Sequence, residues 1–292
     1  MKLIRLLAGA GLCLTLAHCS DSSKNNASDN FAFNLPKGKT FLYSVDYTIG
    51  QEVQGQTINS RIQGDYSMEV TDETDSLKTL RMTYDRIAMN MVTPDQTITV
   101  DSDKGDTATG TAEAANMQGM MNKMFRSMKG KAFTMKVNRE GKVVSIEGMQ
   151  QMADAVVNSM GLPEEARAGV LQGFSQQFND ESLKETFSQS FNIFPNKPVK
   201  VGDTWTRTFA GERTPLNTKT TYTVKAIEGG NVVLDAKSDV SMTGQQSMKG
   251  VQTGTMRVDG KTGLVLNGEV NLALEGPMKM TSKGTFTGKP KS

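Results

Sequence analysis

Runs in which apolar and polar residues alternate constrain the fold of this chain more than any other feature. Every second residue from Phe41 to Ile49 is apolar, which is the period of a strand with one buried and one solvated face. The pattern returns at residues 80–91 and, in the C-terminal part, at 232–236, 264–274 and 278–286. Turns that contain glycine separate many of these runs, so the sequence predicts antiparallel meanders.

The alternation at residues 80–91 changes phase once. Apolar residues occupy even positions as far as Tyr84 and odd positions from Ile87 onward. One extra residue in a strand restores its inward face, and a β-bulge supplies such a residue. We therefore expect a bulge near Asp85-Arg86.

The middle of the chain, from about Thr111 to Ser190, has helical rather than strand spacing. Apolar residues recur every three or four positions: Met117, Met120, Met121, Met124, Phe125, Met128; Met149, Met152, Val156, Met160; Val170, Leu171, Phe174, Phe178; and Leu183, Phe187, Phe191. A hairpin is predicted at Phe133–Ile146, between the first two helices. The pattern indicates three to four amphipathic helices.

Three short segments of the N-terminal half return in the same order in the C-terminal half, which indicates an internal repeat. The matches are Gly38–Phe41 with Gly202–Trp205, Tyr66–Val70 with Tyr222–Ala226, and Thr134–Asn138 with Thr255–Asp259. We therefore expect an α+β fold, mainly antiparallel β, made of two related β-meander units with the helices inserted in the middle of the chain. The units are residues 31–194, which include the helices, and residues 195–292.

The first residues resemble an export signal. Lys2 and Arg5 precede an uncharged apolar run at 6–17, and a run of this length is too short to span a bilayer. Leu16–Cys19 resembles a lipobox, after which cleavage leaves a lipidated cysteine. We expect a signal peptide at 1–18, lipidation of Cys19 and a flexible tether at 19–30.

The lipobox departs from the usual pattern at His18, where such motifs place a small residue. Ordinary signal peptidase offers an alternative, because Ala17 and Cys19 form a small-x-small site and the mature protein would then begin at Ser20. Residues 20–30 are short and mostly polar, as an anchored domain requires of its tether. That composition favours the lipoprotein.

The predicted leader contains the only histidine of the sequence and one of its two cysteines. The single histidine, His18, and Cys13 lie within it, and Cys19 carries lipid or is removed. A histidine-dependent triad, a thiol protease and a Cys/His zinc site are therefore excluded, and we expect no cofactor. Without Lys2 and Arg5, the 33 basic and 31 acidic residues become 31 and 31, a balance that offers no basic footprint for nucleic acid.

Two acidic motifs are candidate sites. Asp101, Asp103 and Asp106 resemble the start of a calcium loop, but Gly105 takes the third ligand position, which favours a solvated turn. Asp203 precedes Trp205 in a Gly-Asp-Thr-Trp segment whose counterpart has Lys39. We interpret Asp203 as a turn residue and Trp205 as a core anchor.

The methionine-rich helical stripes are the sharpest indication of function. They either pack on the sheet as core or line an adaptable apolar cavity over a curved sheet, since methionine fits irregular shapes. The residues expected to contact such a ligand are Met120, Met124, Met152, Met160 and Phe174. The sequence contains no nucleophile elbow or phosphate loop, and a hydrolase would have to rely on two paired carboxylates.

The chain resembles a family of uncharacterised bacterial lipoproteins, domain of unknown function 6263. The resemblance rests on Pro195–Trp205, the Asp101-Ser102 step, Gly130–Phe133 and Gly141–Val143. It implies an exported, anchored protein and carries no catalytic residues. We expect a non-catalytic structural or interaction lipoprotein of the cell envelope, sorted to the outer membrane. It would be held in the membrane by acyl chains on Cys19, with a lipid or an envelope protein as partner. The alternatives are a carrier of an apolar ligand such as lipid, and a carboxylate-based hydrolase.

Overall fold

The computed structural model describes residues 27–292, except 54, 105–106, 178–179, 212–215 and 244–246. The strands of the first half are β1 (Ala27–Phe31), β2 (Thr40–Val53), β3 (Gln56–Glu73), β4 (Leu77–Val92), β5 (Thr97–Asp101), β6 (Thr107–Thr109), β7 (Ala132–Asn138) and β8 (Val143–Glu147). Those of the second half are β9 (Lys197–Lys200), β10 (Thr204–Ala210), β11 (Leu216–Glu228), β12 (Asn231–Met242), β13 (Met248–Asp259), β14 (Val265–Glu275) and β15 (Lys279–Pro290). The helices are α1 (Ala112–Met128), α2 (Met149–Ser159), α3 (Glu164–Gln177) and α4 (Asp180–Phe191). The α+β prediction, with helices inserted in mid-chain, is confirmed.

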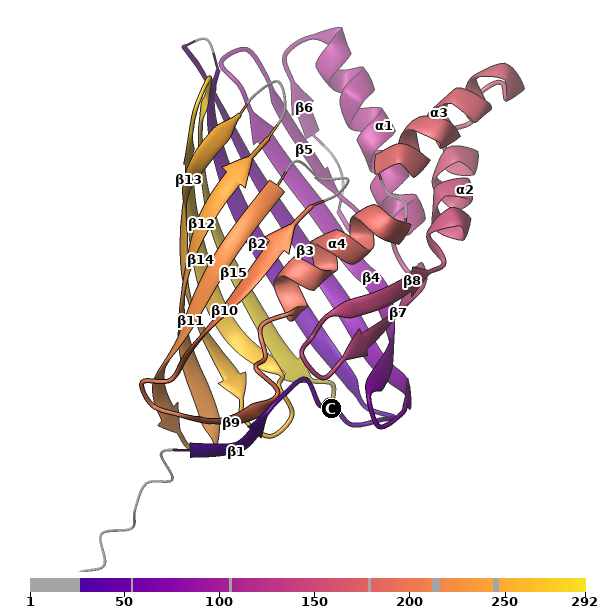
Figure 1. The fold of residues 1–292 in the computed structure, drawn as a ribbon. Helices are drawn as coiled ribbons and strands as arrows, with labels where there is room; N and C mark the ends of the chain where they lie inside the picture. Colours follow the sequence, from indigo (N-terminus) through magenta and orange to yellow (C-terminus); the bar gives the residue numbers. More distant parts are fainter. Residues whose placement is uncertain (1–26, 54, 105–106, 178–179, 212–215, 244–246) are drawn as a thin grey trace, which may run out of the picture.

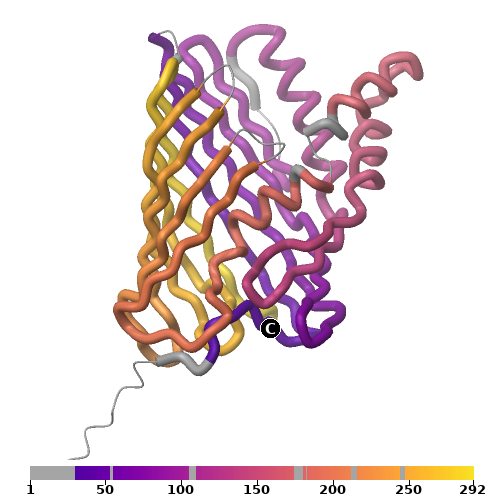
Figure 2. Tube along the Cα trace, viewed as in Figure 1, coloured from indigo at the N-terminus to yellow at the C-terminus, as the bar shows by residue number. Residues whose placement is uncertain are grey.

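Thirteen strands form one antiparallel sheet. Its order is β10-β11-β12-β13-β14-β15-β2-β3-β4-β5-β6, and the β7–β8 hairpin branches from β4. The sheet is strongly curved, and α4 lies across its open side (Figures 1 and 2). The remaining strands, β1 and β9, form a two-stranded ribbon at one end of the curved sheet.

The internal repeat is visible in the order of the strands. β2, β3, β4, β7 and β8 are neighbours in that order in the first unit, and β10, β11, β12, β13 and β14 in the second. The predicted hairpin at Phe133–Ile146 and the hairpin that begins with its repeat match, Thr255–Asp259, therefore hold equivalent positions, as the fourth and fifth strands of their units. β5, β6 and α1 are inserted between the third and fourth strands of the first unit.

The strand register corrects one of the sequence matches. Val70 pairs with Leu80 just before a bulge, and Val224 pairs with Leu234 just before an equivalent bulge. Val70 is thus the counterpart of Val224, so the match of Tyr66–Val70 with Tyr222–Ala226 was wrong by two residues. The alternation of a strand repeats every two residues, which is why a slip of two leaves the pattern intact.

The two units are not separate sheets. β15 pairs with β2 along its whole length, from Lys279 with Glu52 to Pro290 with Phe41. The predicted boundary, between Phe194 and Pro195, lies between α4 and β9. Residues 27–30 of the predicted tether belong to β1, because this segment pairs with β9 and leads into the buried Phe31. Residues 1–26, including Cys19, lie outside the described part.

The predicted bulge in β4 is confirmed. Asp65 pairs with Arg86 and the next residue, Tyr66, pairs with Tyr84, so that Asp85 is the extra residue. Leu80 and Met82 before the bulge, and Ile87 after it, are all buried. The extra residue therefore keeps the apolar side chains of β4 on the inner face.

The helices pack at the β4–β8 side of the sheet. Thr111 caps α1 by accepting a hydrogen bond from the Ala114 N–H, and Gln118 donates to the Thr99 carbonyl of β5 at 3.1 Å. α1 contacts β5 and α2, α2 contacts α3, and α4 contacts β8. Across the described residues, no helix is both long and apolar enough to cross a membrane.

Candidate ligand-binding surface

The two faces of the curved sheet differ in chemistry, as β15 illustrates. Its outward positions are exposed and polar: Lys279, Thr281, Lys283, Thr285, Thr287. Its inward positions are less exposed: Met280, Ser282, Gly284, Phe286, Gly288. Phe286 packs against the main hydrophobic core, which identifies this face as the inner one.

A chain of aromatic rings fills the inner space near β1 and β9. Successive ring centroids lie 5.1–6.2 Å apart, mostly in tilted or edge-to-face pairs, the arrangement that aromatic quadrupoles favour. Its members, in spatial order, are Tyr66, Tyr84, Phe133, Phe187, Phe191, Phe33, Phe194, Phe31, Trp205 and Tyr222. This series of rings links β4 and β7 to β10 through α4 and the segment after β1. It therefore holds the two sides of the sheet together at this end.

Beyond the aromatic chain, part of the inner face is left uncovered. Five side chains in the middle of the sheet are only partly buried, and within the described residues they pack against neither hydrophobic cluster: Val45, Tyr47, Ile49, Ile62 and Val270. Ile62 is 37% exposed although it faces inward. A smaller cluster of Val240, Met248 and Leu274 lies farther along the strands. We call Val45, Tyr47, Ile49, Ile62 and Val270 together the central apolar surface.

The strand register makes the central apolar surface continuous. Val270 pairs with Gly284, Gly284 with Tyr47, and Tyr47 with Ile62. These four residues form one row across β14, β15, β2 and β3. The inward positions of the two next rows carry no charge: Gly64, Gly268, Phe286; Ser60, Leu272, Ser282.

Glycines on the inner face let aromatic rings lie along the sheet. A Cβ atom at Gly284 would sit 2.3 Å from Cε1 of Tyr47, and one at Gly64 would sit 2.5 Å from the hydroxyl oxygen of Tyr66. Both rings therefore occupy the space that a side chain at the glycine would need. These two rings therefore lie along the backbone of the sheet instead of projecting across its concave side.

Tyr47, on this surface, and two tyrosines beside it have a raised pKa. Burial raises the pKa of Tyr47, of Tyr66 and of Tyr84. Tyr66 also lies close enough to Tyr47 for their charges to interact, and its ring centroid lies 5.2 Å from that of Tyr84. The three phenols are therefore neutral hydrogen-bonding groups on an apolar wall.

The helical residues predicted to contact a ligand do not form one surface. Met152 is 2% exposed and belongs to the main core, whereas Met120 is 54% exposed. Met124 and Met160 are partly buried against that core, and the side chain of Phe174 lies outside the described part. Their role as ligand contacts stays a prediction, but their placement favours packing at the sheet edge.

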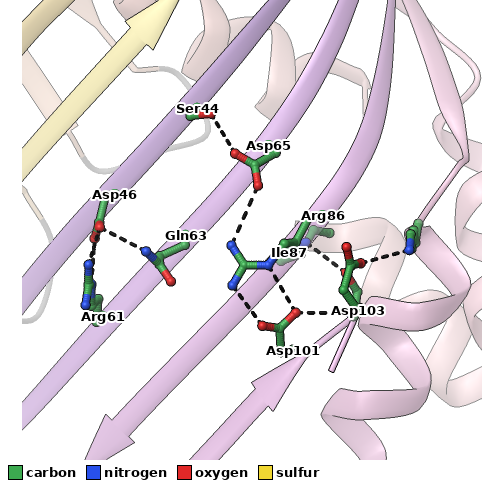
Figure 3. A network of polar contacts seen from close by, with 11 residues as sticks. Ser44, Asp46, Arg61, Gln63, Asp65, Arg86, Ile87, Asp101 and Asp103 are labelled. Atoms are coloured by element: carbon green, nitrogen blue, oxygen red, sulfur yellow. Dashed lines mark hydrogen bonds and ion pairs between the residues drawn. The ribbon is translucent and has the colours of Figure 1, made fainter. Parts of the chain in front are cut away.

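The acidic residues weighed as a calcium loop take part in ion pairs (Figure 3). Asp101 accepts hydrogen bonds from Nε and Nη2 of Arg86 at 3.1 and 2.8 Å, and Asp103 pairs with Lys129 at 2.9 Å. Asp101 is buried, so the expectation of a solvated turn was wrong at this residue. Asp106 lies outside the described residues.

The same network explains the acidity of its carboxyl groups. Hydrogen bonds from Arg86, Lys129 and Arg61 hold the pKa of Asp101, Asp103 and Asp46, respectively, below the usual range. Asp65 accepts from Ser44 and lies 3.6 Å from Arg86. Asp46, Asp101 and Asp103 are therefore ionised, and none of these three is suited to act as a general acid at neutral pH.

Among the carboxyl groups that the structure describes, that of Asp180 has a raised pKa. The causes are burial, followed by the charges of Glu181 and Glu147. Asp180 is the first residue of α4 and is exposed. An exposed helix start does not provide the enclosed pair of carboxylates that glycoside hydrolysis requires.

The Gly-Asp-Thr-Trp segment has the structural role that the sequence indicated. A side-chain oxygen of Asp203 accepts from the Lys200 N–H at 3.0 Å, which closes the turn between β9 and β10. The indole N–H of Trp205 donates to the Ile193 carbonyl at 2.8 Å, and its ring stacks on Tyr222. Trp205 therefore anchors β10 to the aromatic chain.

A hollow of about 520 Å³ lies over β10–β13. Its lining comes mainly from outward positions: Thr208, Ala210, Asn217, Lys219, Asp239, Ser241 and Lys249. It lies on the outward face of these strands, away from the central apolar surface. Nothing about its lining indicates a particular chemistry.

Comparison with known proteins places the chain in a family. The model described as "Family of unknown function (DUF6263)" matches residues 75–265. The chain belongs to this family. No curated protein matches. The matched segment runs from the turn before β4 to the first residue of β14, so the five residues of the central apolar surface lie outside it.

Two solved structures show weak similarity to this chain. One, described as lipid-protein interactions in lipovitellin, is 12% identical with a TM-score of 0.49, and the match covers 89% of this chain and 26% of that chain. The other, the beta domain of the Bordetella autotransporter BrkA, is 8% identical with a TM-score of 0.29. That match covers 85% of this chain and 98% of the autotransporter chain. The chain spans about a quarter of the lipovitellin chain. At these identities and TM-scores, neither structure indicates a function.

Proposed function

We propose that this protein is a non-catalytic binder of an apolar ligand, with an acyl chain as the simplest example. The observation that carries the proposal is the central apolar surface, where aliphatic side chains and a tyrosine remain partly exposed on the inner face of a curved sheet. Soluble proteins rarely leave contiguous apolar surface uncovered unless it binds something. The exposed outward positions of the same strands are largely polar, so the exposure of apolar groups is confined to one face.

The neighbouring inward rows contain no charged residue, which supports an uncharged or weakly polar ligand. The inward rows beside Tyr47 contain Gly, Ser, Leu and Phe. A charged group placed there would lose hydration without gaining an ionic partner. The strand residues of the ion pairs in Figure 3, which are Asp46, Arg61, Asp65, Arg86 and Asp101, have the opposite, outward register.

We further propose that the protein is exported and lipid-anchored at Cys19, on the outer membrane of the cell envelope. Eight residue steps separate Cys19 from Ala27, where β1 begins. An extended chain of that length reaches at most about 30 Å. An anchored domain would thus stay close to the membrane surface, within reach of acyl chains. The test is incorporation of a palmitate analogue, which Cys19→Ala should abolish.

Binding of a neutral fluorescent probe tests the proposed function. N-phenylnaphthylamine brightens in apolar surroundings, and a modest apolar site should bind it with micromolar affinity, about 8 kcal/mol. Ile49→Gln removes apolar contact from the surface and should cost about 1 kcal/mol of binding, roughly fivefold in affinity, because Ile49 is only partly buried.

The neighbouring outward residue supplies a matched control. Thr48 is exposed on the polar face, so Thr48→Gln should leave probe binding unchanged. A wild-type chain that binds no probe, or equal affinity in the two variants, would refute the proposal.

A further inference from the structure

The five tyrosines of the chain fall into two groups. Burial raises the pKa of Tyr43 and raises that of Tyr222 to about 12, and each of these phenols also has a hydrogen bond, to the Val265 backbone and to the Thr220 side chain respectively. Tyr47, Tyr66 and Tyr84 make no hydrogen bond through their hydroxyls to any other described residue. The second group consists of one residue of the central apolar surface, Tyr47, and two tyrosines beside it.

The three phenols without partners lie together. Tyr47 is part of the central apolar surface, and Tyr66 folds along its own strand over Gly64, two residues closer to Ile62. Tyr66 pairs with Tyr84 in the sheet. All three residues are partly buried. Among the described residues, none of the three hydroxyl oxygens is a fully buried atom without a hydrogen-bond partner, so each can be approached from outside the protein.

A phenol in apolar surroundings usually finds a hydrogen-bond partner, because an unpaired hydroxyl is costly there. Three such groups on one wall would be satisfied by the oxygen atoms of a bound molecule. A phenol donates one hydrogen bond and also accepts, so it pairs well with an ester carbonyl or a hydroxyl. It offers no charge to neutralise a carboxylate or a phosphate.

We propose that the ligand is an uncharged amphiphile whose ester and hydroxyl oxygens hydrogen-bond to Tyr47, Tyr66 and Tyr84 while its acyl chain covers Val45, Ile49 and Val270. A monoacylglycerol has this chemistry. The inference rests on the proposed function and adds the polar part of the ligand. It assigns the three tyrosines a role in specificity.

The test compares two ligands and two sets of variants of the full chain. Monoolein supplies ester and hydroxyl oxygens, whereas N-phenylnaphthylamine has no oxygen. Replacing Tyr47, Tyr66 and Tyr84 together by Phe should weaken monoolein binding by about tenfold or more, at a few-fold for each neutral hydrogen bond lost. It should leave probe binding nearly unchanged, because each phenylalanine keeps the aromatic ring and the probe has no oxygen atom to pair with the lost hydroxyls.

Two further readouts separate recognition from general damage. Tyr43→Phe, at a phenol that already has a partner, should leave the affinity for monoolein unchanged. The ester carbonyl stretch of bound monoolein should shift to lower frequency in the wild-type chain and return in the triple variant. Oleate, which has the same acyl chain but a negative charge, should bind more weakly than monoolein.

The outcomes distinguish this inference from the function on which it rests. If the wild-type chain binds neither ligand, both proposals fail. If it binds the probe but monoolein binding is equal in the wild-type chain and the triple variant, only the tyrosine assignment fails. Tighter binding of oleate than of monoolein would also overturn it.

Discussion

The ion pair between Arg86 and Asp101 gives a sharp prediction about stability. The carboxylate of Asp101 receives two hydrogen bonds from the guanidinium and a third, at 3.0 Å, from the Asp103 N–H. The side chains are only 23% and 9% exposed. Asp101→Asn keeps the shape but removes the charge and turns an NH₂ group toward the guanidinium. Arg86 then lacks its main partner in a site that water reaches poorly.

The expected cost is about 2 kcal/mol of unfolding free energy. Removing one partner of a fully buried pair costs about 3–5 kcal/mol, but Arg86 is partly exposed and keeps Asp65 nearby. For a chain of this size, that loss lowers the melting temperature by about 4–8 °C. Urea unfolding followed by Trp205 fluorescence measures it. The exposed Lys37–Asp72 pair is the control, and Asp72→Asn should produce no measurable change.

The loss of stability caused by Asp101→Asn should also depend on pH. The folded-state pKa of Asp101 lies below its unfolded value of about 3.9. Its contribution is therefore fully present above that pH and is lost as pH falls through the folded-state pKa. The gap between the wild-type chain and Asp101→Asn should narrow in acid. A loss below about 0.5 kcal/mol at neutral pH, within the range of ordinary surface changes, or a gap that persists at low pH, would refute the reasoning.

Three further predictions concern the sheet. Gly284→Ala should displace the Tyr47 ring and destabilise the protein by about 1–2 kcal/mol; Gly169→Ala, in open space on α3, should be neutral or stabilising in the same melting experiment. Leu80→Ala and Leu234→Ala, both fully buried at equivalent positions, should each cost about 2–5 kcal/mol and agree with each other within about 1 kcal/mol; widely different losses in urea would contradict the equivalence. The absorbance of phenolate should show Tyr47, Tyr66 and Tyr84 ionising above the usual pKa of about 10, and stability, intact below that pH, should fall as pH rises through their raised pKa values; normal ionisation of all five tyrosines would contradict their burial.

Much of the fold could be predicted because strand periodicity survives in the sequence. The phase change at Asp85 located a bulge, and the recurrence of Gly-x-Thr-Phe/Trp located the first strand of each unit. The register of the repeat was harder to predict, since alternation cannot distinguish Val70 from Met68 as the counterpart of Val224. Only the hydrogen-bond pairing of Val70 with Leu80 resolves it.

The candidate site was missed for a physical reason. Tyr47 and Ile49 were assigned correctly to a half-buried strand, but a sequence does not tell whether an inward face is covered by another layer. Of the helices expected to cover the sheet, α1 and α2 pack near its β4–β8 side. α4 lies across the open side but packs into the aromatic chain rather than onto Tyr47 and Ile49. One signal was available: Gly268, Gly284 and Gly288 fall at the inward positions of the strand alternation, and a glycine there leaves room for a ring from a neighbouring strand.

The position of a bound acyl chain is the most direct test of the central claim. Tryptophan is introduced at Ile49, on the central apolar surface, or at Thr48, on the outward face, and Trp205 is common to both variants. A brominated monoacylglycerol, which quenches indole fluorescence on contact, is then titrated into each. The account predicts that the added emission of Ile49→Trp is quenched at saturation and that of Thr48→Trp is not. Equal quenching of the two, or quenching of neither while the lipid binds, would place the ligand elsewhere and contradict the account.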